Sequence, residues 1–219
     1  MPDFSWEDLL LREGYSVIAG IDEAGRGPLA GPVVAGAVIL PRPFECPDLD
    51  DSKKLPEVRR EEIYERLTTD PAVVWAVGEA SVQEIESLNI LEATHLAMRR
   101  AFHALSVVPQ VALIDGRPLR DFPVPHRGII GGDGLSCSIA AASVLAKVTR
   151  DRLMMEYARV YPHYGFEKHK GYGTKYHLAQ LERHGFCPIH RQAFRPVAEL
   201  ARRAIPEAGI RTGRALDAQ

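Results

Sequence analysis

The chain has few cysteines, no long hydrophobic run and almost no net charge, and the first two shortages each exclude a class of protein. Only three cysteines occur in 219 residues, at Cys46, Cys137 and Cys187. They form neither a disulfide framework nor a zinc-knuckle spacing, so we expect a protein of the reducing cytoplasm. The longest apolar run, Pro32–Leu40, is too short to cross a bilayer, and the first residues lack the parts of a secretion signal. We therefore expect no membrane partner.

The remaining composition is that of an ordinary folded protein. Hydrophobic residues make up 46% of the chain and charged residues 26%, which excludes wholesale disorder. We expect one domain over residues 15–203, preceded by an N-terminal extension of residues 1–14 and followed by a flexible tail, residues 204–219. We also expect the protein to act as a monomer.

The net charge of −2 conceals an asymmetry between the two halves of the chain. Residues 1–115 contain 10 Lys and Arg against 20 Asp and Glu, whereas residues 116–219 contain 17 against 9. A basic C-terminal half favours a polyanion partner, of which nucleic acid is the commonest. The alternative is that the two halves neutralise each other within the fold.

The hydrophobic pattern predicts an α/β fold. Runs of apolar and β-branched residues predict strands at residues 15–22, 33–40, 73–80, 111–115 and 127–131. Helical spacing predicts a short docked helix near the N-terminus and helices at residues 56–67, 81–88, 91–105, 137–160, 174–184 and 196–203. In the longest helix one core-facing stripe is expected, formed by Ile139, Ala142, Ala146, Thr149, Leu153 and Tyr157. This order predicts a mixed five-stranded sheet flanked by helices, with a helical C-terminal portion.

Acidic residues stand where three of the predicted strands end. Asp22 and Glu23 follow the first strand, Asp115 closes the fourth, and Asp133 follows the fifth. Strand ends of α/β sheets collect functional groups, and carboxylates gathered there repel one another unless a cation lies between them. Oxygen-only ligands indicate Mg²⁺ or Mn²⁺, ions that act on phosphates. The alternative is that these residues only form turns beside glycine.

The adjacency of Asp22 and Glu23 imposes a geometric condition on this site. Neighbouring residues of a strand point to opposite faces of the sheet. Both side chains are therefore expected to reach one site only if the first strand has ended by Glu23.

A glycine-rich turn follows the first strand. Gly25, Arg26 and Gly27 do not form a dinucleotide-binding motif, because Pro28 and Pro32 interrupt the segment and a strand follows it. Residues without side chains do, however, allow the backbone to contact a ligand directly. The alternative is a tight turn with no further role.

Six segments together resemble the motifs of the bacterial ribonuclease HII family, the type 2 ribonucleases H. The segments are Ile21–Pro28, Asp51–Leu55, Ile114–Gly116, Gly132–Asp133, Ser138–Asp151 and His169–Thr174. The resemblance extends from about residue 15 to residue 197 and implies a ribonuclease H-like fold. It also implies endonucleolytic hydrolysis of RNA in RNA–DNA hybrids. This includes incision 5′ of a single ribonucleotide embedded in duplex DNA, leaving 3′-hydroxyl and 5′-phosphate ends.

The resemblance also implies roles for individual residues. The catalytic carboxylates that hold two Mn²⁺ or Mg²⁺ ions would be Asp22, Glu23, Asp115 and Asp133. The loop that reads the ribose 2′-hydroxyl would be Gly25, Arg26 and Gly27, and Tyr172 would pack against the nucleotide at the RNA–DNA junction. Apart from the resemblance, we expect Lys147, Arg150 and Lys170 to contact phosphates without reading sequence.

Blander interpretations stay open for some of these residues, and two other functions remain possible. Lys147 and Arg150 could instead lie on a solvated helix face, with Lys147 paired to Asp151 four residues on. Tyr172 could be ordinary loop packing. The competing functions are a non-catalytic module that binds hybrids and a nuclease that acts on DNA junctions.

Overall fold

The computed structural model describes residues 1–45 and 48–204. Cys46 and, except for Ala204, the expected tail lie outside these residues. The core is one five-stranded sheet in the order β3-β2-β1-β4-β5. The strands are β1 Ile18–Ala24, β2 Val33–Ile39, β3 Val74–Ala80, β4 Val111–Asp115 and β5 His126–Ile129. Strands β1, β2 and β3 pair antiparallel, whereas β4 and β5 run parallel to β1, so the predicted mixed sheet is confirmed.

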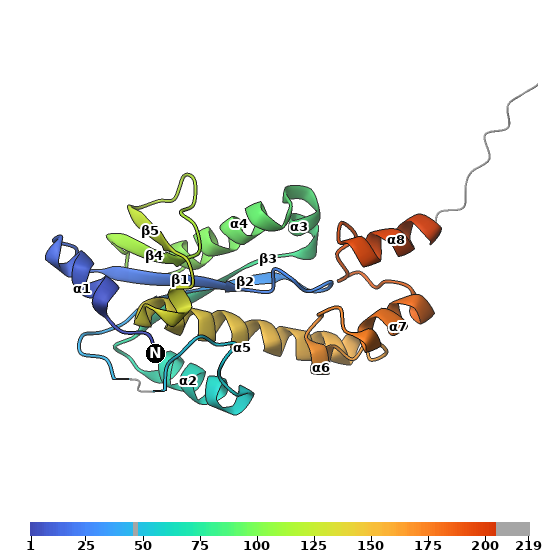
Figure 1. Ribbon diagram of the computed structural model, residues 1–219, viewed down its shortest axis with the longest axis horizontal. Coiled ribbons are helices and arrows are strands. Elements are labelled where there is room, and N and C mark those ends of the chain that lie inside the picture. The colour runs from blue at the N-terminus through green and yellow to red at the C-terminus, as the bar shows by residue number, and fades with distance from the viewer. Residues whose placement is uncertain (46–47, 205–219) are drawn as a thin grey trace, which may run out of the picture.

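Helices cover both faces of this sheet (Figure 1). Helices α3 and α4 lie on one face, and α5 lies along the other with α2 outside it. Helices α6, α7 and α8 gather at one end of the molecule, at the end of β1 that carries the glycine-rich turn. The helices are α1 Ser5–Arg12, α2 Glu57–Thr69, α3 Val82–Leu88, α4 Ile90–His103, α5 Cys137–Val160, α6 Phe166–His169, α7 Lys175–His184 and α8 Arg195–Ala204, with a 3₁₀ turn at Gly132–Gly134.

Helix α5 has the predicted bounds but not the predicted single stripe. Its residues 138–146 are buried on every side, because this half of the helix lies between the sheet and α2. The approach to the sheet is so close that a Cβ on Gly20 would lie 2.1 Å from the carbonyl carbon of Ser138. Glycine at that position of β1 therefore allows the helix to pack directly on the backbone.

The N-terminal extension is tied to the start of the same helix. Leu10 of α1 is buried, and Glu7 Oε1 accepts hydrogen bonds from Ser136 Oγ at 2.6 Å and from Ser138 N at 2.9 Å. A docked helix is what the apolar spacing predicted. The Glu7 carboxylate also lies at the N-terminus of α5, where a negative charge interacts favourably with the helix dipole.

Two local predictions were inaccurate. Strand β1 begins at Ile18 and runs through Ala24, later than residues 15–22, and α6 was not predicted. Helix α6 is a single turn between Gly165 and Lys170, which both have positive φ, so it leaves no hydrophobic period to detect. Among the described residues, no helix is both long enough and apolar enough to span a membrane.

Candidate active site

Three carboxylates converge where β1 and β4 lie side by side. The register pairs Ile21 with Ile114, so Asp22 and Asp115 follow at the same edge of the sheet. One oxygen each of Asp22, Glu23 and Asp115 lies within 4.8 Å of the other two. Since all the donors are carboxylate oxygens, this set suits a hard divalent cation. The strand-end pattern thus predicted this part of the site.

The condition placed on Glu23 was wrong. Strand β1 has not ended at that residue, because Glu23 still pairs with Ala35 of β2. Glutamate has one more methylene than aspartate, and Arg26 Nη1 holds Glu23 Oε1 at 3.1 Å. The longer side chain therefore reaches the group from within the strand.

Burial and mutual repulsion disfavour the charged form of these three carboxylates. Burial, followed by repulsion from Glu23, Asp115 and Asp133, raises the pKa of Asp22 well above its ordinary value. Burial also raises the pKa of Glu23 against the attraction of Arg26, and burial together with repulsion from Asp133 raises the pKa of Asp115. A cation bound among these oxygens would relieve that repulsion, so the residues fit a metal site.

Asp133 lies beside the three carboxylates rather than among them. Its Oδ2 is 3.2 Å from Nζ of Lys53, while its charge still acts on Asp22 and Asp115. Burial opposes the charge on Lys53, but Asp133, Asp22 and Asp51 outweigh it and raise the pKa of Lys53. Sequence reasoning assigned Lys53 no role, although it lies in the Asp51–Leu55 segment that carried the resemblance. A metal-binding role for Asp133 stays a prediction.

The glycine-rich turn and Tyr172 border the same cavity as the carboxylates. This cavity has a volume of about 220 Å³ and is also lined by Lys53 and Lys147. A Cβ placed on Gly27 would lie 3.6 Å from Cε1 of Tyr172, so the turn and the ring face each other closely. Residues from distant parts of the chain, which sequence reasoning singled out separately, therefore meet at one place.

The three predicted phosphate contacts have other partners in the structure. Arg150 is 1% exposed, and its guanidinium donates to the carbonyls of Pro32, Lys170 and Ala30, each at 3.0 Å. Helix α5 carries it beneath the glycine-rich turn, at the border of the carboxylate cavity, and its contact with a phosphate stays a prediction. Lys170 is 9% exposed and donates to the Glu167 carbonyl at 2.5 Å, so its ammonium is also turned toward protein.

Lys147 forms the ion pair that the helical spacing predicted. Its Nζ lies 2.7 Å from Asp151 Oδ1, and the side chain still borders the cavity of the carboxylates. Burial lowers the pKa of Lys147 against the attraction of Asp151. Its contact with a phosphate stays a prediction.

Sequence reasoning missed Arg191, which is completely buried under the glycine-rich turn. Its guanidinium donates to the carbonyls of Gly25 at 2.6 Å, Arg26 at 3.0 Å and Gly31 at 2.7 Å. Burial lowers the pKa of Arg191 to about 9 and that of Arg150 to about 10, so both remain charged at neutral pH. Neither guanidinium forms an ion pair with a carboxylate among the described residues. The turn consequently rests on two positive charges, which favours an anion above it.

A buried histidine pair lies beneath Tyr172. Nε2 of His177 is 2.9 Å from Nε2 of His190, and Nδ1 of His177 is 2.9 Å from the Tyr172 carbonyl oxygen. Both rings are at most 1% exposed. Desolvation by burial lowers the pKa of each ring to about 4, so both are neutral at physiological pH.

This pair predicts a loss of stability in mild acid. The unfolded chain binds these protons near pH 6.5, whereas the folded chain binds them only near pH 4, so stability decreases as the pH falls through that window. A shift of this size corresponds to about 3 kcal/mol for one ring. We expect His177→Phe to flatten the dependence of Tm on pH between 4 and 6.5 in thermal melts.

The carboxylates of the site act with the opposite sign, because their raised pKa values make the folded state bind protons first. The difference between the wild type and His177→Phe therefore isolates the rings. Parallel pH profiles for the two proteins would contradict neutral burial of the pair.

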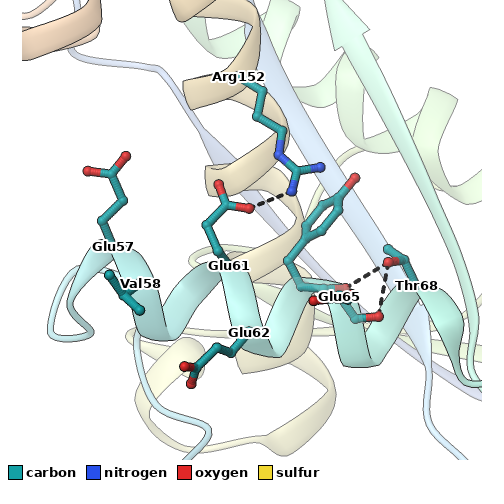
Figure 2. Close-up of a pocket in the computed structure, with 8 residues that line it drawn as sticks. Glu57, Val58, Glu61, Glu62, Glu65, Thr68 and Arg152 are labelled. Atoms are coloured by element: carbon teal, nitrogen blue, oxygen red, sulfur yellow. Dashed lines mark hydrogen bonds and ion pairs between the residues drawn. The ribbon is translucent and has the colours of Figure 1, made fainter.

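A more spacious depression of the surface lies elsewhere and has the wrong charge for nucleic acid. It has a volume of about 740 Å³ and runs along α2, where Figure 2 shows Glu57, Glu61, Glu62 and Glu65. Only Arg152 of α5 reaches into it, and that guanidinium pairs with Glu61. A polyanion would be repelled here, so the smaller cavity of the carboxylates is the candidate active site.

Comparison with known proteins shows the family of this chain. The family model described as Ribonuclease HII matches residues 19–197. The chain belongs to the ribonuclease HII family. It is 56% identical over 179 residues to ribonuclease HII of Desulfitobacterium hafniense, covering 82% of this chain and 68% of that protein. It is 50% identical over 185 residues to ribonuclease HII of Endomicrobium trichonymphae, covering 84% of this chain and 88% of that protein.

A solved structure extends the likeness to the fold. The crystal structure of ribonuclease H2 from Pyrococcus horikoshii superposes with a TM-score of 0.72 at 25% identity, covering 86% of this chain and 98% of that one. The predicted ribonuclease H-like fold is therefore confirmed. As a ribonuclease HII family member the chain is a metal-dependent endoribonuclease of the ribonuclease H class, whose substrates are RNA–DNA hybrids.

Proposed function

We propose that this enzyme incises duplex DNA on the 5′ side of a single embedded ribonucleotide, in addition to cleaving RNA in hybrids, and that it uses two Mn²⁺ or Mg²⁺ ions. One observation carries the proposal: Asp22, Glu23 and Asp115 share a cavity with the Gly25–Gly27 turn and Tyr172. Groups suited to hydrolysing a phosphodiester therefore lie beside a surface suited to examining one sugar.

Recognition of the ribose follows from the bare backbone of the turn. A backbone that donates to and accepts from the 2′-hydroxyl would leave its groups unpaired with a deoxyribose, and buried unpaired groups are costly. The ring of Tyr172 offers a flat face that needs no particular base. The two elements together would distinguish RNA from DNA without reading sequence.

The carboxylates supply the chemistry by holding the ions. Divalent cations held there would supply a Lewis acid for activating a water molecule and for stabilising the leaving 3′ oxygen of the nucleotide that precedes the ribonucleotide, which yields 3′-hydroxyl and 5′-phosphate ends. Asp22, Glu23 and Asp115 would ligate them, with Asp133 as the fourth carboxylate. In this proposal the 2′-hydroxyl is the recognised group and not the nucleophile.

A substrate panel tests this function directly. The protein is incubated with a DNA duplex containing one ribonucleotide, the same duplex in all-DNA form, and a continuous RNA–DNA hybrid, in Mg²⁺ or Mn²⁺ and in excess chelator. We expect incision 5′ of the ribonucleotide, cleavage of the hybrid, no cleavage of DNA, and no product with chelator. Cleavage of the all-DNA duplex would favour the junction nuclease, and binding without cleavage would favour the non-catalytic module.

Removing the ring of Tyr172 should impair incision at the single ribonucleotide with little effect on folding. The side chain is 47% exposed, so Tyr172→Ala removes little buried area. Stacking of an aromatic ring on a base contributes about 1–3 kcal/mol, which corresponds to roughly 5- to 150-fold in kcat/KM. Tyr176→Ala is the matched control, because Tyr176 is 51% exposed on α7 and does not line the cavity of the carboxylates. Equal losses in the two variants would remove Tyr172 from the site.

A further inference from the structure

We propose that the short segment Cys187–Arg191 positions both halves of the ribose-recognition surface, the Gly25–Gly27 turn through Arg191 and the Tyr172 loop through the His190–His177 pair. This inference rests on the proposed function, because it concerns the surface that would read the sugar. His177, His190 and Arg191 are positioning residues: they act through the backbone that carries the recognition groups.

The support of the turn is a fork of hydrogen bonds from one side chain. Arg191 binds the carbonyls of Gly25, Arg26 and Gly31, whereas the backbone of its segment binds the far side of the same turn. Gly31 N donates to Ile189 O at 2.9 Å, and Arg191 N donates to Leu29 O at 2.8 Å. With its carbonyls occupied from below, the turn is held in one conformation.

The support of Tyr172 is a chain of hydrogen bonds that runs in one direction. A carbonyl only accepts, so His177 must carry its proton on Nδ1, which faces the Tyr172 oxygen at 2.9 Å. The Nε2 of that neutral ring then accepts from Nε2 of His190. His190 Nδ1 in turn accepts from the backbone N–H of Cys187 at 2.9 Å. Every polar atom of both rings is satisfied by this one arrangement.

The arrangement tolerates no additional proton. Protonation of His177 would place two N–H groups against each other across the 2.9 Å between the Nε2 atoms, and protonation of His190 would do the same across the 2.9 Å between its Nδ1 and Cys187 N. The rings are also packed by Tyr164, Phe166 and His169, so they have no space in which to turn away. The pair therefore holds the Tyr172 loop at a fixed position relative to the segment Cys187–Arg191.

The two supported elements meet directly above this segment. Leu29 N donates to Gly171 O at 2.8 Å, and the position of a Cβ on Gly27 lies 3.6 Å from the Tyr172 ring. A displacement of either support would change the gap in which the sugar must fit. Misplacement of about 1 Å is enough to cost a large factor in rate.

A double-mutant cycle between His177 and Tyr172 separates positioning from general stabilisation. We expect His177→Phe to lower kcat/KM on the single-ribonucleotide duplex roughly 10-fold or more. In the Tyr172→Ala background the same substitution should have no further effect, because the ring it positions is already gone. His177→Asn should recover activity, since its amide can donate to the Tyr172 carbonyl. An equal loss in both backgrounds would overturn the proposal.

A destabilised control and a second variant complete this test. Leu67→Ala removes a fully buried side chain from α2, away from the recognition surface, and should lower Tm without changing the preference for the ribonucleotide-containing duplex over the continuous hybrid. Arg191→Lys keeps the charge but loses the fork, so we expect that preference to fall. A preference that falls in Leu67→Ala as much as in Arg191→Lys would mean that stability alone sets it.

The tautomers can be read without any activity. Nitrogen-15 spectra of histidine-labelled protein at pH 7 should show one neutral ring protonated at Nδ1 and another at Nε2, assigned with His177→Phe. Two rings of the same tautomer, or charged rings, would overturn the proposal. This readout uses no substrate. A wild type that failed to incise ribonucleotides would therefore contradict the proposed function, while the spectra would still test the hydrogen-bonded histidine pair.

Discussion

Replacing Asp22 with asparagine should abolish cleavage and at the same time make the metal-free protein more stable. Asp22 is buried, and three other carboxylates act on its charge, which raises its pKa. Asparagine removes that charge and can still accept the hydrogen bond that Glu23 N donates to Oδ1 at 2.7 Å. The folded state then loses a repulsion that the unfolded chain never had, so Tm should rise.

Catalysis should change in the opposite direction. Metal ions contribute several kcal/mol to stabilising the charge of a transition state, so losing one ligand should lower the rate roughly 10³-fold or more. A bound cation at about 100 times its Kd also stabilises the wild type by about 2.7 kcal/mol, and this metal-dependent rise in Tm should be lost in Asp22→Asn.

Calorimetry with and without Mn²⁺ measures the Tm of the metal-free protein and its rise with metal, while a cleavage assay measures the rate. Glu7→Gln is the control. Glu7 is also a buried acid, but it is bound to Ser136 and Ser138 instead of facing other carboxylates. We expect its metal-dependent rise in Tm to be intact. Full cleavage by Asp22→Asn, or a metal response equal to that of the wild type, would contradict the assigned site.

Adding one methyl group to either glycine of the turn should have opposite consequences for folding and function. Gly27 has open space around it apart from the Tyr172 ring at 3.6 Å, so Gly27→Ala should fold normally. The methyl group would nevertheless stand in the gap where the sugar is read. We expect cleavage to fall roughly 100-fold, since a misplacement of about 1 Å has an effect of this size.

Gly25→Ala should instead damage the fold. Gly25 has φ +102°, and a Cβ there would lie 2.1 Å from Nε of Arg150 and 2.7 Å from the Pro32 carbonyl oxygen. We expect a loss on the order of 3 kcal/mol, or roughly 6–12 °C in Tm. Thermal melts and cleavage assays on both variants check the contrast, and a strongly destabilised Gly27→Ala would contradict it.

Local patterns predicted much of this fold. The bounds of α5 follow from a cap and a hydrophobic period, and Ser136 Oγ does accept from Ile139 N at 3.3 Å. Helix α3, predicted over residues 81–88, likewise begins at a capping box, with Glu84 N donating to Ser81 Oγ at 3.2 Å. The carboxylates could be grouped because strand ends of neighbouring strands meet at one edge of the sheet.

The supports of the site could not be predicted in this way. Arg150 was expected to contact a phosphate or to lie on a solvated helix face, and only the packing of α5 beneath the turn shows that it is buried. Arg191 lies 166 residues from the Gly25 carbonyl that it binds, and no local period connects them. The contact of Lys53 with Asp133 could not be predicted either, because the two residues lie 80 positions apart in the sequence. Each of these contacts depends on tertiary structure that a pattern within a few residues does not contain.

The late position of Cys187–Arg191 has a consequence for how the enzyme matures on the ribosome. All the acids of the site have been synthesised by residue 133, and helix α5 ends at Val160, whereas Arg191 is synthesised only afterwards. A growing chain can thus assemble its acidic pocket before Arg191 is available to bind the carbonyls of the turn beside it. We expect the newly made protein to gain discrimination between sugars later than it gains its acidic pocket.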